Sequence, residues 1–294
     1  MRIGANGLEF EIDDQGPRDG APLLLIMGLG MQLIAWPEPL VAELVKRRFR
    51  VIRMDNRDIG LSQHLDTLGV PSVFGAMLRH TLRLKVTSPY SLQQMAADCA
   101  GVLDALGIVR AHVCGASMGG MIAQHLAARH ASRVASLTLV MTTSGARHLP
   151  KPSLAVRSAL LARPKDDSPE ARCDALEHVL RVIGSPGYPP DPVALRARVA
   201  ASVARSWHPQ GTARQLLAIA ADGDRTPMLS AIAAPTAIVH GMADPLIPVA
   251  AASDLARKIR GATLDLIPGM GHDLPTELLP RLAADIAGNV DRVH

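Results

Sequence analysis

Short apolar segments alternate with helical patterns through most of the chain. Residues 8–13 alternate apolar and polar side chains, and residues 23–27 form a short apolar run that ends at Gly28. Residues 91–106 begin with a serine suited to capping, carry apolar side chains at helical spacing and are followed by Gly107, which predicts a helix. The same criteria predict strands at residues 50–55, 111–116, 134–141, 236–240 and 263–267, and helices at 40–49, 119–129, 249–259 and 277–290. This alternation predicts an α/β fold, with a mostly parallel central sheet and helices on both faces.

The pattern changes between residues 144 and 226. Helical stretches there alternate with turn-rich pieces such as residues 184–192, which read Gly-Ser-Pro-Gly-Tyr-Pro-Pro-Asp-Pro. A strand pattern returns at residue 236. We therefore predict one sheet domain formed by residues 1–143 and 227–294, with residues 144–226 inserted as a helical cap. Ligands of such sheets bind at the carboxyl ends of the strands, so the cap is expected over that edge.

Composition favours a soluble protein of the cytoplasm. The longest apolar runs, such as residues 21–27, are far shorter than the roughly 20 residues of a membrane-spanning helix, and no signal-peptide pattern opens the chain. The three cysteines, Cys99, Cys114 and Cys173, are odd in number and lack the paired spacing of metal ligands. We expect no disulfide framework, no metal site and no membrane insertion.

The charge pattern argues against a nucleic-acid partner. The chain carries 31 Lys and Arg against 27 Asp and Glu, a formal net charge of +4, and the excess is dispersed. Aromatic residues make up only 2% of the chain, so stacking rings are not interleaved with basic residues. We expect a small-molecule substrate, and the sequence leaves the oligomeric state open.

One serine lies between two glycines where a predicted strand meets a predicted helix. Gly115, Ser117 and Gly119 form the pattern Gly-x-Ser-x-Gly, which is typical of a nucleophile elbow. Such a turn presents the serine hydroxyl at the sheet edge, and the helix N-terminus beneath it favours developing negative charge. A plain glycine-rich turn with a capping serine is the alternative, and the strand before and helix after favour the elbow.

A nucleophilic serine needs a histidine base and an acid that orients it. In this type of fold the chain order is serine, acid, histidine, each after a strand. Asp244 follows the strand predicted at 236–240, and His272 lies in a glycine-flanked loop after the strand at 263–267. The strand at 134–141 is followed by Thr142 and Thr143 and offers no carboxylate. Asp273 is disfavoured as the acid because it adjoins the histidine, so we predict a triad of Ser117, Asp244 and His272.

Acyl transfer also requires two donors for an oxyanion. The residue after the nucleophile, Met118, supplies one backbone amide, and Leu29, in the glycine-rich loop after residues 23–27, is predicted to supply the other. Several methionines fall in the loops expected around this site, which suggests an adaptable apolar wall. We assign substrate binding to Gly28, Met27, Met242 and Met270.

With few aromatic residues in the chain, the cap's share of the wall must be mostly aliphatic. Candidates are Leu154, Leu160, Leu161, Leu176, Val179, Leu180, Leu216 and Leu217. Packing between cap helices is the better explanation for any one of them, but together they predict an apolar pocket.

These motifs resemble the α/β-hydrolase superfamily across residues 8–143 and 227–290. Residues 27–30 (Met-Gly-Leu-Gly), 55–62 (Asp-Asn-Arg-Asp-Ile-Gly-Leu-Ser), 115–119 (Gly-Ala-Ser-Met-Gly) and 268–272 (Pro-Gly-Met-Gly-His) are similar to the branch that contains the aclacinomycin methylesterase and related small carboxylesterases. Met27 stands where the superfamily usually has histidine, and Asp58 replaces a common glycine. The resemblance implies the α/β-hydrolase fold, gives Arg57 a structural role in its loop, and says nothing of the cap.

The resulting prediction is a serine carboxylic ester hydrolase that acts on apolar short- to medium-chain or small-molecule esters without a cofactor. Lactonase, perhydrolase and carbon–carbon bond hydrolase activities use the same triad and remain open. A non-hydrolytic small-molecule receptor that keeps the pocket is the alternative from another class, because fold alone does not settle function. Dehalogenase and epoxide hydrolase chemistry on this fold would need a carboxylate where the chain has Ser117.

Overall fold

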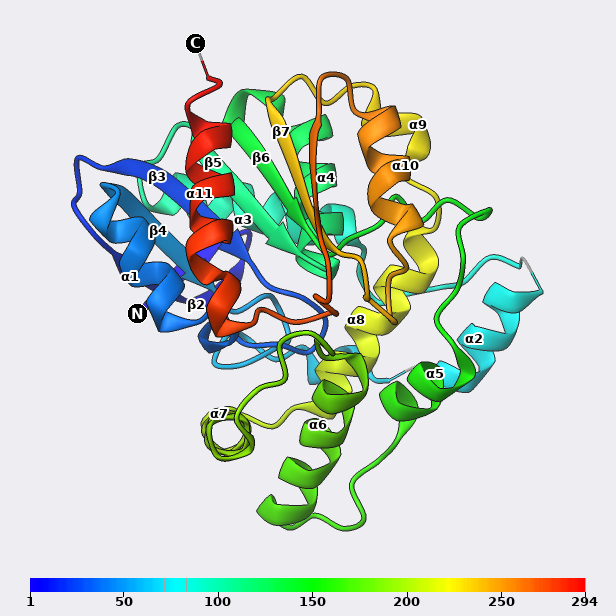
Figure 1. Ribbon diagram of the computed structural model, residues 1–294. Coiled ribbons are helices and arrows are strands. Elements are labelled where there is room, and N and C mark those ends of the chain that lie inside the picture. Colours follow the sequence, from blue (N-terminus) through cyan, green and yellow to red (C-terminus); the bar gives the residue numbers. More distant parts are fainter. Residues whose placement is uncertain (71, 83, 294) are drawn as a thin grey trace.

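A single sheet of eight strands runs through the molecule (Figure 1). The computed structural model describes residues 1–70, 72–82 and 84–293. The strand order is β1-β2-β4-β3-β5-β6-β7-β8, in which β1 and β2 are antiparallel to their neighbours and all other pairings are parallel. The strands are β1 Arg2–Ala5, β2 Leu8–Gln15, β3 Ala21–Ile26, β4 Phe49–Met54, β5 Ala111–Ala116, β6 Val134–Val140, β7 Thr236–Gly241 and β8 Thr263–Ile267. The predicted mostly parallel sheet is confirmed.

Helices cover both faces of this sheet. One face packs against α1 and α11, and the other against α3, α4 and α10, so two apolar layers enclose the strands (Figure 1). The bounds are α1 Glu38–Lys46, α2 Val73–Thr81, α3 Leu92–Ala105, α4 Met118–Arg129, α10 Ala250–Lys258 and α11 Leu279–Val290. Because β3, β5 and β6 lie between both layers, their side chains are almost continuously apolar and buried.

Local sequence explains where the clearest helix begins. In α3, the Ser91 hydroxyl accepts a hydrogen bond from the Gln94 amide at 3.1 Å, and the Gln94 side chain accepts one from the Ser91 amide at 2.9 Å. This capping box satisfies two amides that have no partner inside the helix. Another predicted helix, at residues 40–49, is shifted: α1 ends at Lys46, and Phe49 already belongs to β4.

The segment between β6 and β7 forms five helices. They are α5 Leu154–Leu161, α6 Pro169–Ile183, α7 Pro192–Arg205, α8 Pro209–Asp222 and α9 Thr226–Leu229. In Figure 1, α6, α7 and α8 lie beyond the ends of the parallel strands, and α6 packs between α5 and α7. The helix α2, between β4 and α3, was not predicted and packs against α8. Among the described residues, no helix is both long and apolar enough to cross a membrane.

Candidate active site

The Gly-x-Ser-x-Gly segment forms a tight turn between β5 and α4. Ser117 has φ 54° and ψ −118°, a conformation that side-chain-bearing residues rarely adopt. The flanking glycines allow the close packing of this turn. A Cβ atom on Gly115 would lie 2.3 Å from the Gly119 carbonyl oxygen, and one on Gly119 would lie 2.0 Å from that of Ile26. Both positions therefore exclude any side chain.

The turn brings Ser117 to a histidine and an acid from two other strand ends. His272 Nε2 lies 3.0 Å from Ser117 Oγ, and its Nδ1 lies 2.7 Å from Asp244 Oδ2. The other oxygen of Asp244 accepts hydrogen bonds from the amides of Leu246 and Ile247 at 2.9 and 2.7 Å. Because Asp244 accepts these amide bonds, its carboxylate is fixed against the imidazole, which favours the tautomer with a free Nε2 facing the serine. The structure thus brings together all three residues predicted for the triad.

The loop after β3 lies against the serine. A Cβ atom on Gly28 would be 3.1 Å from the Ser117 Cβ, so the backbone of this loop approaches the hydroxyl closely. Met118 is the first residue of α4, where helical amides have no partner inside the helix. Leu29 lines the same cavity as Ser117. Both residues predicted to supply the oxyanion donors therefore lie at the site of Ser117.

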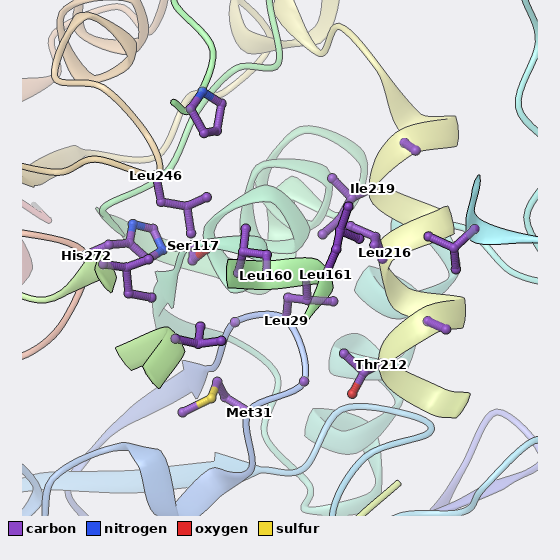
Figure 2. Close-up of a pocket in the computed structure, with 18 of the residues that line it drawn as sticks. Leu29, Met31, Ser117, Leu160, Leu161, Thr212, Leu216, Ile219, Leu246 and His272 are labelled. Carbon is purple, nitrogen blue, oxygen red and sulfur yellow. Dashed lines mark hydrogen bonds between the residues drawn. The ribbon is translucent and has the colours of Figure 1, made fainter. Parts of the chain in front are cut away.

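A cavity of about 2180 Å³ opens beside this serine. Figure 2 shows Ser117 and His272 on one side of it and Leu216 and Ile219, from α8, on the other. The volume is well above the roughly 300–1,000 Å³ typical of sites for drug-sized ligands. Side chains of α2 also line the cavity, including Val73, Phe74 and Met77. The arrangement places a hydrogen-bonded serine within a large, mainly apolar space.

A comparison of the whole sequence agrees with this geometry. The family model described as alpha/beta hydrolase fold matches residues 21–277. The chain belongs to the α/β-hydrolase family. The predicted fold and the resemblance to methylesterases are confirmed by this match and by a relative. Rhodomycin D methylesterase DnrP of Streptomyces peucetius is 29% identical to it, over 92% of this chain and 90% of that protein.

Two other proteins are similar along nearly their whole length. The non-heme chloroperoxidase of Burkholderia pyrrocinia is 26% identical over 96% of this chain and 95% of its own. The crystal structure of the enol-lactonase from Burkholderia xenovorans LB400 matches with a TM-score of 0.75 and 27% identity, covering 99% of this chain and 100% of that one. Proteins similar to this hydrolase are thus named for different reactions.

Two methionines of this hydrolase that were predicted to form the substrate wall lie elsewhere. Met27 and Gly28 line the cavity, but Met242 and Met270 are not among its lining residues. Met242 is half exposed because it turns outward after β7, and Met270 is buried in the core beside α11. Their position in loops near the triad did not reveal the direction of their side chains. Neither belongs to the pocket wall, contrary to the prediction.

Most of the predicted cap side chains do line the cavity. They are Leu160, Leu161, Leu176, Val179, Leu180 and Leu216. Leu154 instead faces solvent on the outer side of α5, with 77% of its surface exposed. Leu217 is fully buried against Ala76 and Val86, because it lies on the side of α8 that packs on α2. The predictions for Leu154 and Leu217 were wrong because each side chain lies on a helix face that points away from the cavity.

Two polar residues that the sequence did not single out, Asn56 and Gln215, hold the loop after β3. Asn56 donates to the Met27 carbonyl at 2.9 Å. Gln215 of α8 accepts from the Gly30 amide at 2.9 Å and donates to the Arg57 carbonyl at 3.0 Å. Its partners lie more than 150 positions away, so no local signal marked it. Asn56 belongs to the motif at residues 55–62, and that membership is the sequence signal that marks it.

The backbone and the contacts of Asp58 explain why an aspartate can replace the glycine that is common at this position in the superfamily. Its φ of 72° is in the left-handed region, where glycine is common and aspartate is tolerated. The side chain accepts from Arg214 Nε at 2.5 Å and Nη2 at 2.7 Å, and from the Tyr90 hydroxyl at 3.1 Å. Burial acts to raise the pKa of Asp58, but the hydrogen bonds from Arg214 and the Leu65 amide outweigh it and lower the pKa. Asp58 therefore joins the loop after β4 to α8.

Arg57 lies apart from the serine in a buried ion pair. Its Nε and Nη2 donate to Asp98 at 2.6 and 2.7 Å, and its guanidinium lies over the Tyr90 ring. This pair connects the loop to α3 and fits the structural role that the resemblance implied. Cys114, three residues before the serine, is fully buried, and burial raises the pKa of its thiol far above the usual range. A buried, protonated thiol is inert as a nucleophile.

Proposed function

We propose that this hydrolase is a serine carboxylic ester hydrolase in which Ser117 is the nucleophile. The observation that carries the proposal is the hydrogen-bonded chain from Ser117 Oγ through His272 to Asp244, at 3.0 and 2.7 Å, on the wall of the cavity. The methylesterase name of the relative that aligns over 92% of the chain supports ester chemistry.

The reaction follows from which atoms face one another. His272 Nε2 takes the proton of Ser117 as the oxygen attacks the ester carbonyl, and Asp244 stabilises the resulting imidazolium. The amides of Met118 and Leu29 donate to the oxyanion. Protonated His272 then gives its proton to the departing alcohol. A water activated by the same imidazole hydrolyses the acyl-enzyme, and no cofactor takes part in either half of the reaction.

The cavity supports apolar or bulky small-molecule esters as substrates. Its wall contains the aliphatic side chains of the cap, and its volume accommodates more than a short acyl chain. Residues 144–226 act in this proposal as the cap that supplies that wall, over a core formed by 1–143 and 227–294. The protein is expected to work as a cytoplasmic enzyme on free small molecules.

Hydrolysis of p-nitrophenyl acetate and butyrate, together with the mass of the protein after exposure to a fluorophosphonate, tests the proposal. We expect turnover of both esters and one adduct, located on Ser117 by peptide mapping. An adduct on Ser117 without ester turnover would keep Ser117 as the nucleophile. Turnover of a lactone, or of an acyl donor with hydrogen peroxide as acceptor, would then assign a different reaction to it. Absence of both turnover and adduct would favour a small-molecule receptor.

A further inference from the structure

Two histidines and an aspartate meet where the loop after β4 touches the start of α8. His64 and Asp66 belong to the loop, and His208 directly precedes α8. One ligand atom from each of the three lies within 4.8 Å of the others. The two imidazole rings stack in parallel, with 3.7 Å between centroids and 3° between planes. The sequence alone did not predict this cluster, because His208 lies 142 positions from Asp66.

Each ring has one nitrogen against a backbone carbonyl. His208 Nδ1 lies 2.9 Å from the Asp58 carbonyl oxygen, and His64 Nε2 lies 3.0 Å from that of Gly60. A carbonyl oxygen only accepts hydrogen bonds, so both of these nitrogens carry a proton. In neutral rings this leaves lone pairs on His208 Nε2 and His64 Nδ1. Metal-binding histidines commonly donate their other N–H to a carbonyl in this way.

The nitrogen left on His208 faces another acceptor. His208 Nε2 lies 2.9 Å from Asp66 Oδ1, and a carboxylate oxygen has no proton to give. Two lone pairs at this distance require a positive charge between them, either a proton or a metal ion. A proton on Nε2 satisfies His208 alone. Nδ1 of His64 and Oδ2 of Asp66 belong to exposed side chains and have no hydrogen-bond partner among the described residues, so both are open to an ion from solvent.

We propose that His64, Asp66 and His208 form a binding site for a divalent transition metal ion of the zinc class. Imidazole nitrogens and a carboxylate suit such an ion, and the exposed side of the cluster admits water as a fourth ligand. Imidazole binds a metal through a lone pair in the plane of its ring, so both rings must tilt from their parallel stacking when they bind one ion.

The surrounding charges are compatible with a cation. Asp58 and Asp66 both contact Arg214, so two carboxylates face one guanidinium. Arg214 Nη2 binds Oδ1 of Asp66 at 2.9 Å, which leaves Oδ2 for the metal. The ion would connect the loop after β4 to α8, whose Thr212, Leu216 and Ile219 line the cavity (Figure 2). Its role is to stabilise the pocket wall, and it takes no part in the chemistry at Ser117.

Calorimetric titration of the full chain with zinc chloride, after dialysis against EDTA, tests this site. We expect one ion per chain in the wild type and affinity lowered at least about tenfold in His64→Ala and Asp66→Asn. Both residues are exposed, so these variants should remain folded. His178→Ala, which removes an exposed histidine of α6 outside the cluster, is the matched control and should bind like the wild type.

Two further measurements distinguish a bound metal ion from a proton on His208. Cobalt should give visible absorption bands that are lost in His64→Ala, and zinc should raise the melting temperature of the wild type and not of that variant. Absence of stoichiometric binding, or binding unchanged in both variants, would overturn the proposal. So would nitrogen NMR showing that His208 carries two protons at pH 7.5 with one equivalent of zinc present. None of these readouts depends on ester hydrolysis, so the site and the proposed reaction can fail separately.

Discussion

The backbone of Ser117 is held in an unfavourable conformation by its neighbours. Positive φ at a residue with a side chain costs of order 1–3 kcal/mol, and the turn keeps it because β5 and α4 pack closely on both sides. Gly115 and Gly119 make that packing possible, since each has a carbonyl oxygen within 2.3 Å of where a Cβ would lie. The geometry at the serine thus depends on the absence of two side chains.

Gly119→Ala should therefore destabilise the protein by at least about 2 kcal/mol, because a methyl group would overlap the Ile26 carbonyl. Urea unfolding followed by circular dichroism measures the change. Gly288→Ala is the matched control: it lies in α11 with no atom within 4 Å of the added Cβ, and should stabilise by about 0.5–1 kcal/mol. Equal stability of the two variants would contradict the packing argument.

The carboxyl group of Asp285, on α11, has a raised pKa. Burial and the neighbouring charge of Asp265 raise the pKa of Asp285 to about 6, against 3.8 as its ordinary value. Between these two values the folded state binds more protons, so ionisation of Asp285 lowers stability as pH rises from about 4 to 6. Asp285→Asn should then stabilise the protein at pH 8 by about 1 kcal/mol, after allowance for solvent screening.

The stabilisation by Asp285→Asn should vanish below pH 4, where the carboxyl is protonated in both states. Unfolding free energies at pH 3.5 and pH 8 check the sign. A gain that is the same at both values would show that the effect comes from helix propensity and not from the charge.

At the scale of elements, Arg214 connects α8 to Asp58 in the loop after β4. Both side chains are fully buried and share two hydrogen bonds. Removing one member of a buried pair leaves the other charge unpaired and costs about 3–5 kcal/mol. Arg214→Met should show such a loss in urea unfolding. The double variant Asp58→Asn, Arg214→Met should recover part of it, and a double variant less stable than Arg214→Met alone would contradict the pairing argument.

The elements differ in how far the sequence predicted them. The strands β3, β5 and β6 are short, mostly apolar runs, so their pattern was sufficient. The helix α2 was missed because it has only nine residues, contains Gly75 and is held by packing on α8. Ser117, Asp244 and His272 were predictable since each follows a strand. Gln215 was not, because its contacts with the loop after β3 exist only in the folded chain.

At the scale of the whole molecule, the core and the inserted helices together enclose the cavity. Its apolar wall should favour uncharged esters, with each added methylene contributing at most about 0.8 kcal/mol until the space is filled. We expect kcat/KM to rise from acetate through butyrate to hexanoate and octanoate. A succinyl half-ester is the control for charge. Fastest turnover of that half-ester would contradict the apolar pocket and indicate a role for basic residues on the wall, such as Arg147 and Lys151.

The central claim is that Ser117, His272 and Asp244 act as one catalytic unit, and kcat/KM of single and double variants tests it most directly. Ser117→Ala and His272→Ala should each lower kcat/KM for p-nitrophenyl butyrate by several orders of magnitude without unfolding the protein, and Asp244→Asn comparably. Members of one triad give grossly non-additive losses, so the double variant Ser117→Ala, His272→Ala should be little worse than either single variant. Losses that multiply, or a Ser117→Ala protein with near wild-type activity, would contradict the account.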